Sequence, residues 1–371
     1  MSGEHAERSG ERLAPAHLYP EGALSPPFGM IDVRSPIEWS RGALPGAHPL
    51  PLMSDEERRE VGIRYAEVGQ EAAVELGWEL VGPHLEERIA AWRRVADQGP
   101  TAVICWRGGM RSALASELIA RPRTLPVAGG YKAVRRHLMQ ALPAALERAP
   151  LLVVSGLTGS GKTELLRSLA GASDVLEVID LEAIAAHRGS SFGAVTGPQP
   201  PQPTFEHEIA CALRLHRAGL VVVEDESRYV GRRTLPDALL EAMRKAPLAL
   251  LEVPNGERVQ RVFREYVKEP AQRDGIAATR QALEAATLRL RRRLGGPRTR
   301  EVLSALERAE AAWFDLEAHR AWILLLLEQY YDRLYERNRV ALGRDVVLRG
   351  DVQELTERLP ELAAERGRRP R

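Results

Sequence analysis

The chain has 371 residues and a formal net charge of +1, with 44% hydrophobic and 28% charged residues. This composition is typical of a soluble globular protein of two or three domains, and so balanced a charge does not indicate a strongly acidic or basic partner. The longest apolar run, AWILLLLE at 321–328, is too short to cross a membrane, and two widely separated cysteines exclude a disulfide framework and favour a reducing cytoplasm.

The first part of the chain alternates strand-like and helix-like segments. Residues 1–14 are polar and charged, without an apolar signal-peptide core, and we expect a short disordered tail there. The strand-like segments that follow are MIDV at 30–33, TAVIC at 101–105 and TLPVAGG at 124–130. Helical patterns separate them, and this alternation predicts a parallel sheet flanked by helices.

The alternation starts again after a proline-bracketed stretch at 142–150. The expected strands are LLVVSG at 151–156, DVLEVIDLE at 174–182, LVVVEDES at 220–227 and PLALLEVP at 247–254. A proline-rich loop, GPQPPQPTFEHE at 197–208, interrupts the pattern, and the chain becomes helix-rich and charged from Gly256 to about Arg339. A second α/β domain with a helical extension is therefore predicted.

The octapeptide GLTGSGKT at 156–163 fits the phosphate-loop pattern G-x-x-x-x-G-K-[ST] between a strand and a helix. Its glycines let backbone N–H groups face inward, and the helix N-terminus adds a positive dipole end. Lys162 would reach the outer phosphate oxygens, and Thr163 could hold a magnesium ion. The residues expected to bind a diphosphate or triphosphate are Gly156, Thr158, Gly159, Ser160, Gly161, Lys162 and Thr163.

Two further segments supply candidate residues for the same site. LVVVEDESR at 220–228 ends a strand in acids, which is the position of a metal-binding acid, although such acids are often only solvated. DLEAIAAHRGSSFG at 180–193 offers an anion contact, although a lone histidine is usually structural. These candidates are Asp180, His187, Arg188, Ser190, Asp225, Glu226, Ser227 and Arg228, with magnesium expected at Thr163 and Asp225 if a metal is used.

Cys105 ends an apolar strand and precedes a loop that is expected to enter a helix at about Ser112. Such a loop points several N–H groups at one spot and, with nearby arginines, stabilises a reactive thiolate. The catalytic candidates are Cys105, Arg107, Gly108, Gly109 and Arg111. Phosphatases and sulfurtransferases both use such a cysteine, and Ile104, where most such phosphatases have histidine, counts slightly against the first. The alternative is a buried structural thiol, which is the interpretation favoured for Cys211 on the apolar stripe of a helix.

Charge is uneven along the helix-rich part. Between Glu257 and Arg300 there are twelve Lys and Arg against five Asp and Glu, including RLRRR at 289–293. This surplus is either a solvated helix face or the footprint of a polyanion.

The segment IDVRSPIEWSRGALPGAHPLPL at 31–52 resembles the opening of a rhodanese domain. The matching residues are Asp32, Arg34, Glu38, Gly42, Pro45, Gly46 and Ala47. The loop CWRGGMR is one residue longer than the usual rhodanese loop. A wider cradle suits a larger anion, and we expect it to be sized for selenophosphate or a bound perselenide.

The motifs CWRGGMRS, GLTGSGKTELL, DLEAIAAHRGSSFG, QPPQPTFE and VEDESRYVG occur in this order. Together they closely resemble the tRNA 2-selenouridine synthases, in which a rhodanese domain is fused to a P-loop domain. The resemblance covers roughly residues 15–340. YYDRLY at 330–335 also resembles that family's tail motif, with Arg333 where proline is expected.

The resemblance implies a cytoplasmic tRNA-modifying enzyme without a tightly bound cofactor or a membrane contact. Its substrates would be geranyl diphosphate, held by the P-loop for S-geranylation of the wobble 2-thiouridine, and selenophosphate, whose selenium then replaces the geranylthio group. Cys105 would carry or deliver selenium, and the basic helices would grip the tRNA backbone.

The implied fold is an α/β chain with an N-terminal rhodanese-like domain and a C-terminal P-loop NTPase-like domain. The expected parts are a tail at 1–14, a rhodanese-like domain at 15–141, a P-loop domain at 142–255 and a tRNA-contacting helical extension at 256–371. Two alternatives are a rhodanese sulfurtransferase fused to an ATP-dependent kinase-like domain that acts on a small molecule, and a non-catalytic nucleotide-sensing module.

Overall fold

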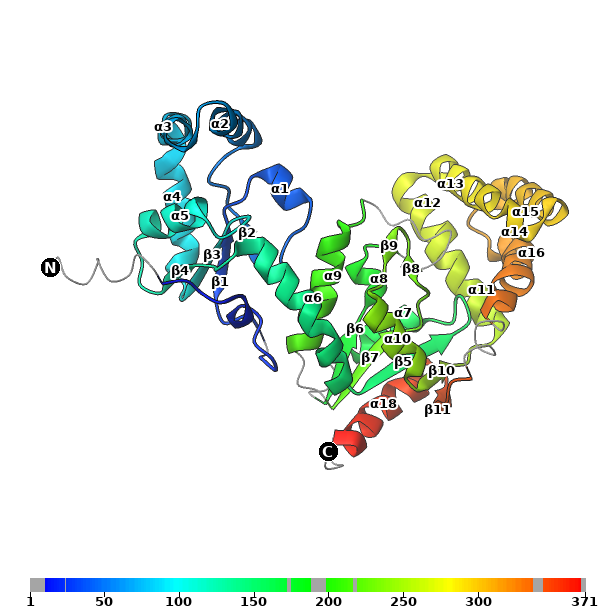
Figure 1. The fold of residues 1–371 in the computed structure, drawn as a ribbon. Coiled ribbons are helices and arrows are strands. Elements are labelled where there is room, and N and C mark those ends of the chain that lie inside the picture. Colours follow the sequence, from blue (N-terminus) through cyan, green and yellow to red (C-terminus); the bar gives the residue numbers. More distant parts are fainter. Residues whose placement is uncertain are drawn as a thin grey trace. The chain divides into compact units, whose positions relative to one another are not determined.

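The computed structural model describes residues 11–23, 25–171, 175–187, 198–215, 219–335 and 343–367. The chain is α/β and forms two compact units (Figure 1). The first contains Met1–Ala145 and Pro200–Arg217, and the second contains Leu146–Gln199 and Ala218–Arg371. Among the described residues, no helix is both long and apolar enough to span a bilayer.

The first unit is built on a parallel four-stranded sheet with the order β2-β1-β3-β4. The strands are β1 (Gly29–Asp32), β2 (Ala47–Pro49), β3 (Thr101–Ile104) and β4 (Thr124–Pro126). Ile31 of β1 lies opposite Val103 of β3, and both are fully buried because helices cover the central strands. Leu13, which lies inside the segment expected as a disordered tail, forms a bridge with Val127 beyond β4.

Seven α-helices belong to the described part of this unit. They are α1 (Pro36–Ser40), α2 (Asp55–Glu67), α3 (Gln70–Val81), α4 (Leu85–Ala96), α5 (Met110–Ile119), α6 (Gly130–Arg148) and α9 (Gln202–Leu215). Helix α9 begins at Gln202, inside the segment expected as a proline-rich loop. Pro203 is compatible with this start, because the first turn of a helix needs no N–H donor. The structure therefore assigns part of that loop to a helix of the first unit.

The second unit contains a parallel five-stranded sheet with the order β11-β10-β5-β7-β6. Its strands are β5 (Leu151–Gly156), β6 (Leu176–Ile179), β7 (Leu220–Glu224), β10 (Leu248–Leu251) and β11 (Val346–Gly350). Around it lie α7 (Lys162–Leu169), α8 (Leu181–Ile184), α10 (Asp237–Lys245), α18 (Val352–Gly367) and a small hairpin of β8 (Tyr229–Val230) and β9 (Arg233–Thr234). Because β5 is central, the loop that follows it emerges in the middle of the sheet edge.

Between β10 and β11 the chain forms a helical layer with its own core (Figure 1). Its elements are α11 (Asn255–Phe263), η3 (Arg264–Lys268), α12 (Glu269–Asp274), α13 (Ile276–Arg289), α14 (Arg291–Leu294), α15 (Gly296–Ala309), α16 (Leu316–Leu326) and η5 (Leu327–Tyr331). η3 and η5 are π-helical. The last part of the segment expected as a helical extension does not belong to the helical layer. Strand β11 joins the five-stranded sheet, and helix α18 packs against the core of that sheet.

Candidate active site

The loop after β5 has the shape of a phosphate-binding loop. Gly159 and Gly161 have φ angles of +79° and +96°, which only glycine adopts without strain. Helix α7 begins at Lys162, whose Nζ donates to the carbonyl oxygen of Gly156 at 2.9 Å. The loop lines a pocket of about 800 Å³. Six of the seven residues expected to bind a diphosphate line this pocket, and the seventh, Ser160, is buried and does not line it.

Two arginines of α11 hold this loop in place. Arg258 is fully buried, and its Nε donates to the carbonyl oxygen of Thr158 at 3.0 Å. Its two terminal nitrogens donate to the carboxylate of Asp332 at 3.0 and 2.6 Å. Arg261 donates to the carbonyl oxygen of Gly159 at 2.9 Å and pairs with Glu164. The loop is thereby tied to the helical layer through charge-assisted hydrogen bonds.

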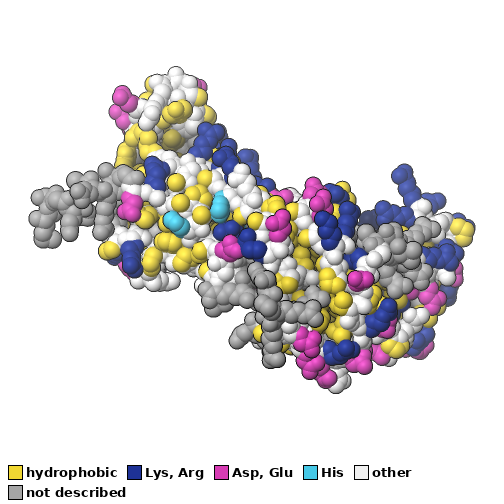
Figure 2. Space-filling model, turned by 60° about the horizontal axis from the view of Figure 1, so that its bottom comes forward, with side chains coloured by type: hydrophobic (Ala, Val, Ile, Leu, Met, Phe, Trp, Pro, Cys, Tyr) yellow, Lys and Arg dark blue, Asp and Glu magenta, His cyan; other side chains and the backbone are white. Residues whose placement is uncertain are grey.

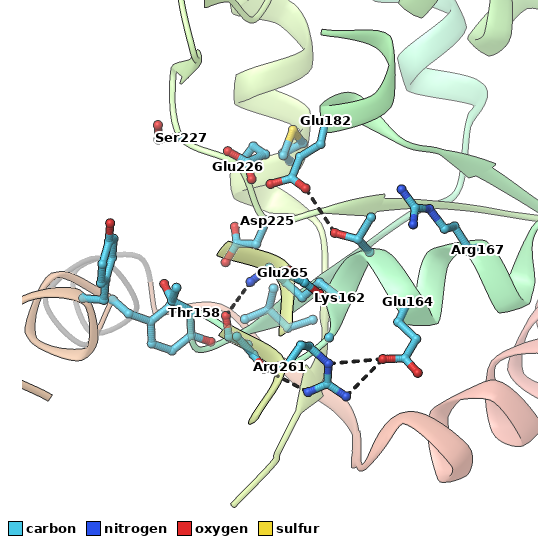
Figure 3. A pocket seen from close by; sticks show the side chains of 18 of the residues that line it. Thr158, Lys162, Glu164, Arg167, Glu182, Asp225, Glu226, Ser227, Arg261 and Glu265 are labelled. Carbon is cyan, nitrogen blue, oxygen red and sulfur yellow. Dashed lines mark hydrogen bonds and ion pairs between the residues drawn. The ribbon is translucent and has the colours of Figure 1, made fainter. Parts of the chain in front are cut away.

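Carboxylates form another side of the pocket. In the view of Figure 3, Glu182, Asp225 and Glu226 lie beside Lys162. Thr163 Oγ1 donates to Glu182 at 3.1 Å. Asp225 accepts a hydrogen bond from Ser155 Oγ and one of 2.9 Å from Arg344. Asp225 is thus paired with a cation, whereas Glu182 accepts from Thr163 at the start of α7.

Crowding changes the protonation of these acids. Burial raises the pKa of Glu226 to about 8, the charges of Glu182 and Asp225 add to the rise, and Lys162 opposes it. Burial also raises the pKa of Glu224, which accepts a hydrogen bond from the backbone N–H of Glu182 at 2.6 Å. At neutral pH Glu226 therefore carries a proton, and an anion that enters the pocket would meet less negative charge than the sequence suggests.

The remaining predicted residues of this unit have mixed positions. Asp180 caps α8 by accepting from the N–H of Ala183 at 2.7 Å, and the ring of His187 lies against Gly231. Neither lines the pocket, whereas Ser227 and Arg228 do. Arg188 and Ser190 lie outside the described residues.

Oxygen donors suited to a hard cation stand at the start of α7. They are the Thr163 hydroxyl and the carboxylate of Glu182, with Asp225 nearby. No group of three His, Cys, Asp or Glu side chains within the described ranges could hold a metal ion by itself. These oxygen donors suit a magnesium ion that would take most of its ligands from substrate oxygens and water.

Cys105 lies directly after β3, at the start of the loop that leads into α5. It is buried, and its Sγ lies 3.2 Å from Ser112 Oγ. Gly108 has a φ of +64°, and a Cβ there would meet the backbone of Val127 and Gly129 at 2.5 Å. The loop is packed so closely on the chain after β4 that glycine is required at this position.

Of the two predicted arginines, one is fixed beside the loop and one is exposed. Arg111 donates to both carboxylate oxygens of Glu38 at 2.6 and 3.1 Å, and a thiolate at Cys105 would interact with its charge. Arg107 is exposed. Helix α5 starts at Met110, two residues before the expected Ser112, so Arg111 lies in its first turn.

An aromatic and cationic network supports this loop. Trp106 stacks on Tyr131 with ring centroids 5.3 Å apart, and the Arg34 guanidinium lies 3.9 Å from the centroid of Tyr131. Arg34 is buried and forms a bidentate pair with Asp32. His207 of α9 meets Tyr131 edge to face and bonds through Nδ1 to the carbonyl oxygen of Ala43 at 2.7 Å.

Sequence reasoning missed several of these residues. Glu182, Arg258 and Arg261 carry no signal of their own, because their partners are remote in the chain. Asp332 belongs to the YYDRLY motif, which could have pointed to it. Cys211 is buried on α9 as expected, and burial raises the pKa of its thiol.

A parallel sheet whose central strand runs through a glycine loop into a helix that starts with Lys-Thr defines a P-loop α/β protein. The family model described as "tRNA 2-selenouridine synthase AAA domain" matches residues 149–366. The chain belongs to the tRNA 2-selenouridine synthase family.

Relatives carrying that name cover nearly the whole chain. The protein from Cupriavidus necator is 42% identical over 91% of this chain and 95% of its own. The protein from Marinobacter nauticus is 40% identical over 88% and 93%, and that from Bordetella bronchiseptica is 39% identical over 89% and 93%. A solved N-terminal domain of an ATP/GTP-binding protein from Clostridium difficile covers 34% of this chain at a TM-score of 0.31, which is too low to establish a common fold.

Proposed function

We propose that the chain is a tRNA-modifying transferase that converts wobble 2-thiouridine to 2-selenouridine. S-geranylation with geranyl diphosphate comes first, and selenium from selenophosphate then replaces the geranylthio group. Full-length similarity to proteins named tRNA 2-selenouridine synthase supports the overall reaction. The observation that carries the two-step division is that one chain holds both a phosphate loop with a pocket and a separate cysteine loop.

In the first step we place geranyl diphosphate on the loop at 156–163. The sulfur of 2-thiouridine attacks C1 of the geranyl group, the C1–O bond breaks, and pyrophosphate leaves with the bonding electrons. Lys162 and the N–H groups at the start of α7 would stabilise that charge. A magnesium ion held by Thr163 and Glu182 or Asp225 would neutralise further phosphate charge.

In the second step a selenium nucleophile attacks C2 of the uracil, and the C2–S bond breaks to release geranylthiolate. S-alkylation makes this possible because it turns a poor leaving group into a good one. We place selenophosphate at the Cys105 loop, in a rhodanese-like domain, with Cys105 delivering the donor, Arg111 next to it and Arg107 available at the surface. The selenium of this donor is already at the selenide level, so it attacks C2 without an oxidant, and the Se–P bond breaks as water takes the phosphoryl group. The extra loop residue is expected to widen the cradle, and a loop shortened by one residue that still transfers selenium would contradict that idea.

We place tRNA on the helical layer and the protein in the cytoplasm with its substrate. Of the twelve basic residues between Glu257 and Arg300, five form ion pairs with acids: Arg258, Arg261, Arg264, Arg273 and Arg280. Arg291, Arg292 and Arg300 remain exposed. On the face shown in Figure 2, basic side chains gather in patches beside acidic ones, so contact with phosphates would be local rather than continuous.

The test is nucleoside mass spectrometry on tRNA containing 2-thiouridine. Purified protein with both geranyl diphosphate and selenophosphate should yield 2-selenouridine. Omission of selenophosphate should stop the reaction at geranylthiouridine, and omission of geranyl diphosphate should leave thiouridine. If 2-thiouridine is unchanged in every reaction and the protein hydrolyses ATP rapidly, the kinase-like alternative would be favoured instead.

A further inference from the structure

A second cavity adjoins the P-loop pocket in the helical layer. Six of its lining side chains do not reach the P-loop pocket: Val262, Leu283, Trp322, Ile323, Leu326 and Leu327. All six are hydrocarbon or indole groups, and the indole N–H of Trp322 is already bonded to His319 at 3.1 Å. We call this cavity the apolar slot.

The slot and the P-loop pocket meet at three residues. Thr158, Tyr266 and Tyr331 line both cavities. Thr158 belongs to the phosphate loop itself, so a ligand whose phosphates lie on the loop stands at the mouth of the slot. The junction is also fixed, because Arg258 holds both the Thr158 carbonyl and Asp332, the neighbour of Tyr331.

Both tyrosines of the junction come from π-helical turns. Tyr266 lies in η3 and Tyr331 lies in η5. A π turn inserts an extra residue into a helix, interrupts the regular hydrogen bonding, and is frequently found at functional sites. Two such turns meeting beside a phosphate loop indicate that the helices are shaped for a ligand there.

The chemistry of the slot selects among diphosphates. A nucleobase presents donors and acceptors that need polar partners when buried, and the six side chains provide none. A hydrocarbon chain needs only apolar contact. The slot is also small, with a volume of about 30 Å³ against about 800 Å³ for the P-loop pocket.

We propose that the apolar slot binds the distal end of the hydrocarbon chain of an allylic diphosphate, and that its small volume limits the chain length accepted. This rests on the proposed function, since the diphosphate must occupy the P-loop. Leu326 and Val262, from two different helices, act as specificity-determining side chains.

The test measures dissociation constants of the full-length protein for inorganic pyrophosphate and for dimethylallyl, geranyl and farnesyl diphosphates. Each buried methylene strengthens binding about fourfold, so wild type should bind geranyl diphosphate at least about tenfold more tightly than pyrophosphate. Leu326→Ala should raise the affinity for farnesyl diphosphate relative to that for geranyl diphosphate by about fivefold or more. Val262→Ala, at a half-buried position, should shift it in the same direction and serves if Leu326→Ala does not fold.

Leu306→Ala is the matched control, because Leu306 is buried in the same core without lining the slot. It should leave all preferences within about twofold of wild type, and every variant should keep its pyrophosphate affinity. If wild type prefers geranyl diphosphate but all variants keep the relative affinities of wild type for the three allylic diphosphates, the slot does not bind the hydrocarbon chain. If wild type binds pyrophosphate and geranyl diphosphate equally, the isoprenyl donor itself is wrong, and the slot proposal fails with it.

Discussion

Glu226 shows how a single side chain can change its charge because of its neighbours. Its pKa is raised to about 8 by burial and by Glu182, so the folded protein keeps a proton that the unfolded chain releases above about pH 4.5. Stability is therefore lost as pH rises from about 4.5 to about 8.

Glu226→Gln should be more stable than wild type by about 4 kcal/mol at pH 8.5, because the amide does not ionise. The two proteins should converge below about pH 4.5. Thermal unfolding across this range measures the difference, with Glu241→Gln at an exposed site of α10 as the control. A gain of the same size at every pH would mean that ionisation is not its cause.

Arg258 is the fully buried arginine that ties the phosphate loop to the helical layer. It is buried, and lysine cannot reproduce its bidentate bond to Asp332 together with the bond to Thr158. Arg258→Lys should cost about 3 kcal/mol of stability and weaken pyrophosphate binding.

The matched control is Arg273→Lys, which alters an exposed pair with Asp274 and should leave stability almost unchanged. Equal effects of the two substitutions in calorimetry would show that the Arg258 pair does not anchor the loop.

Among the elements, α9 has the largest departure from its expected role. Its His207 is fully buried against the cysteine-loop network, and burial lowers the pKa of the imidazole to about 4. Stability from a neutral buried histidine is present above about pH 6.5 and is lost as pH falls toward 4.

Between pH 6.5 and 4 the free energy of unfolding of wild type should therefore fall by about 2–3 kcal/mol more than that of His207→Asn. Asparagine can keep the bond to the Ala43 carbonyl without titrating. Urea unfolding monitored by tryptophan fluorescence at several pH values makes the comparison. An identical acid loss in both proteins would assign it to other groups.

Elements with local signals could be predicted from the sequence. β3, β5, β7 and β10 are short apolar runs, and the phosphate loop has a fixed spacing, so each is specified by neighbouring residues. Elements defined by remote partners could not be predicted. β11 becomes a strand only because β10 offers its edge, and α9 packs against residues more than a hundred positions earlier in the chain.

The candidate sites divide in the same way. Lys162 and Cys105 are found by motif, whereas Glu182, Arg258 and Arg261 are recognised only from their contacts with Thr163 and with the carbonyl groups of the phosphate loop. The two π turns leave no pattern in composition or periodicity, and hence the apolar slot was invisible in the sequence.

For the whole molecule, the distribution of charge predicts how tRNA binding responds to salt. With the three exposed arginines Arg291, Arg292 and Arg300 on phosphates, the slope of log affinity against log salt should be about −2 to −3. Replacing Arg291 and Arg292 with alanine should reduce its magnitude by about 1.5, whereas Arg320→Ala, which removes a charge paired with Glu317, should change it little. A flat response to salt in filter binding would contradict a phosphate-tracking surface.

In the proposed function, two loops of one chain perform two successive transfers. The most direct measurement is nucleoside mass spectrometry on 2-thiouridine tRNA incubated with both donors and either Lys162→Ala or Cys105→Ala protein. We expect unchanged thiouridine with the Lys162→Ala protein and geranylthiouridine with the Cys105→Ala protein. We expect 2-selenouridine when tRNA from the Cys105→Ala reaction is passed to the Lys162→Ala protein. Loss of geranylation in the Cys105→Ala protein, or selenouridine formed by it, would contradict this division between the loops.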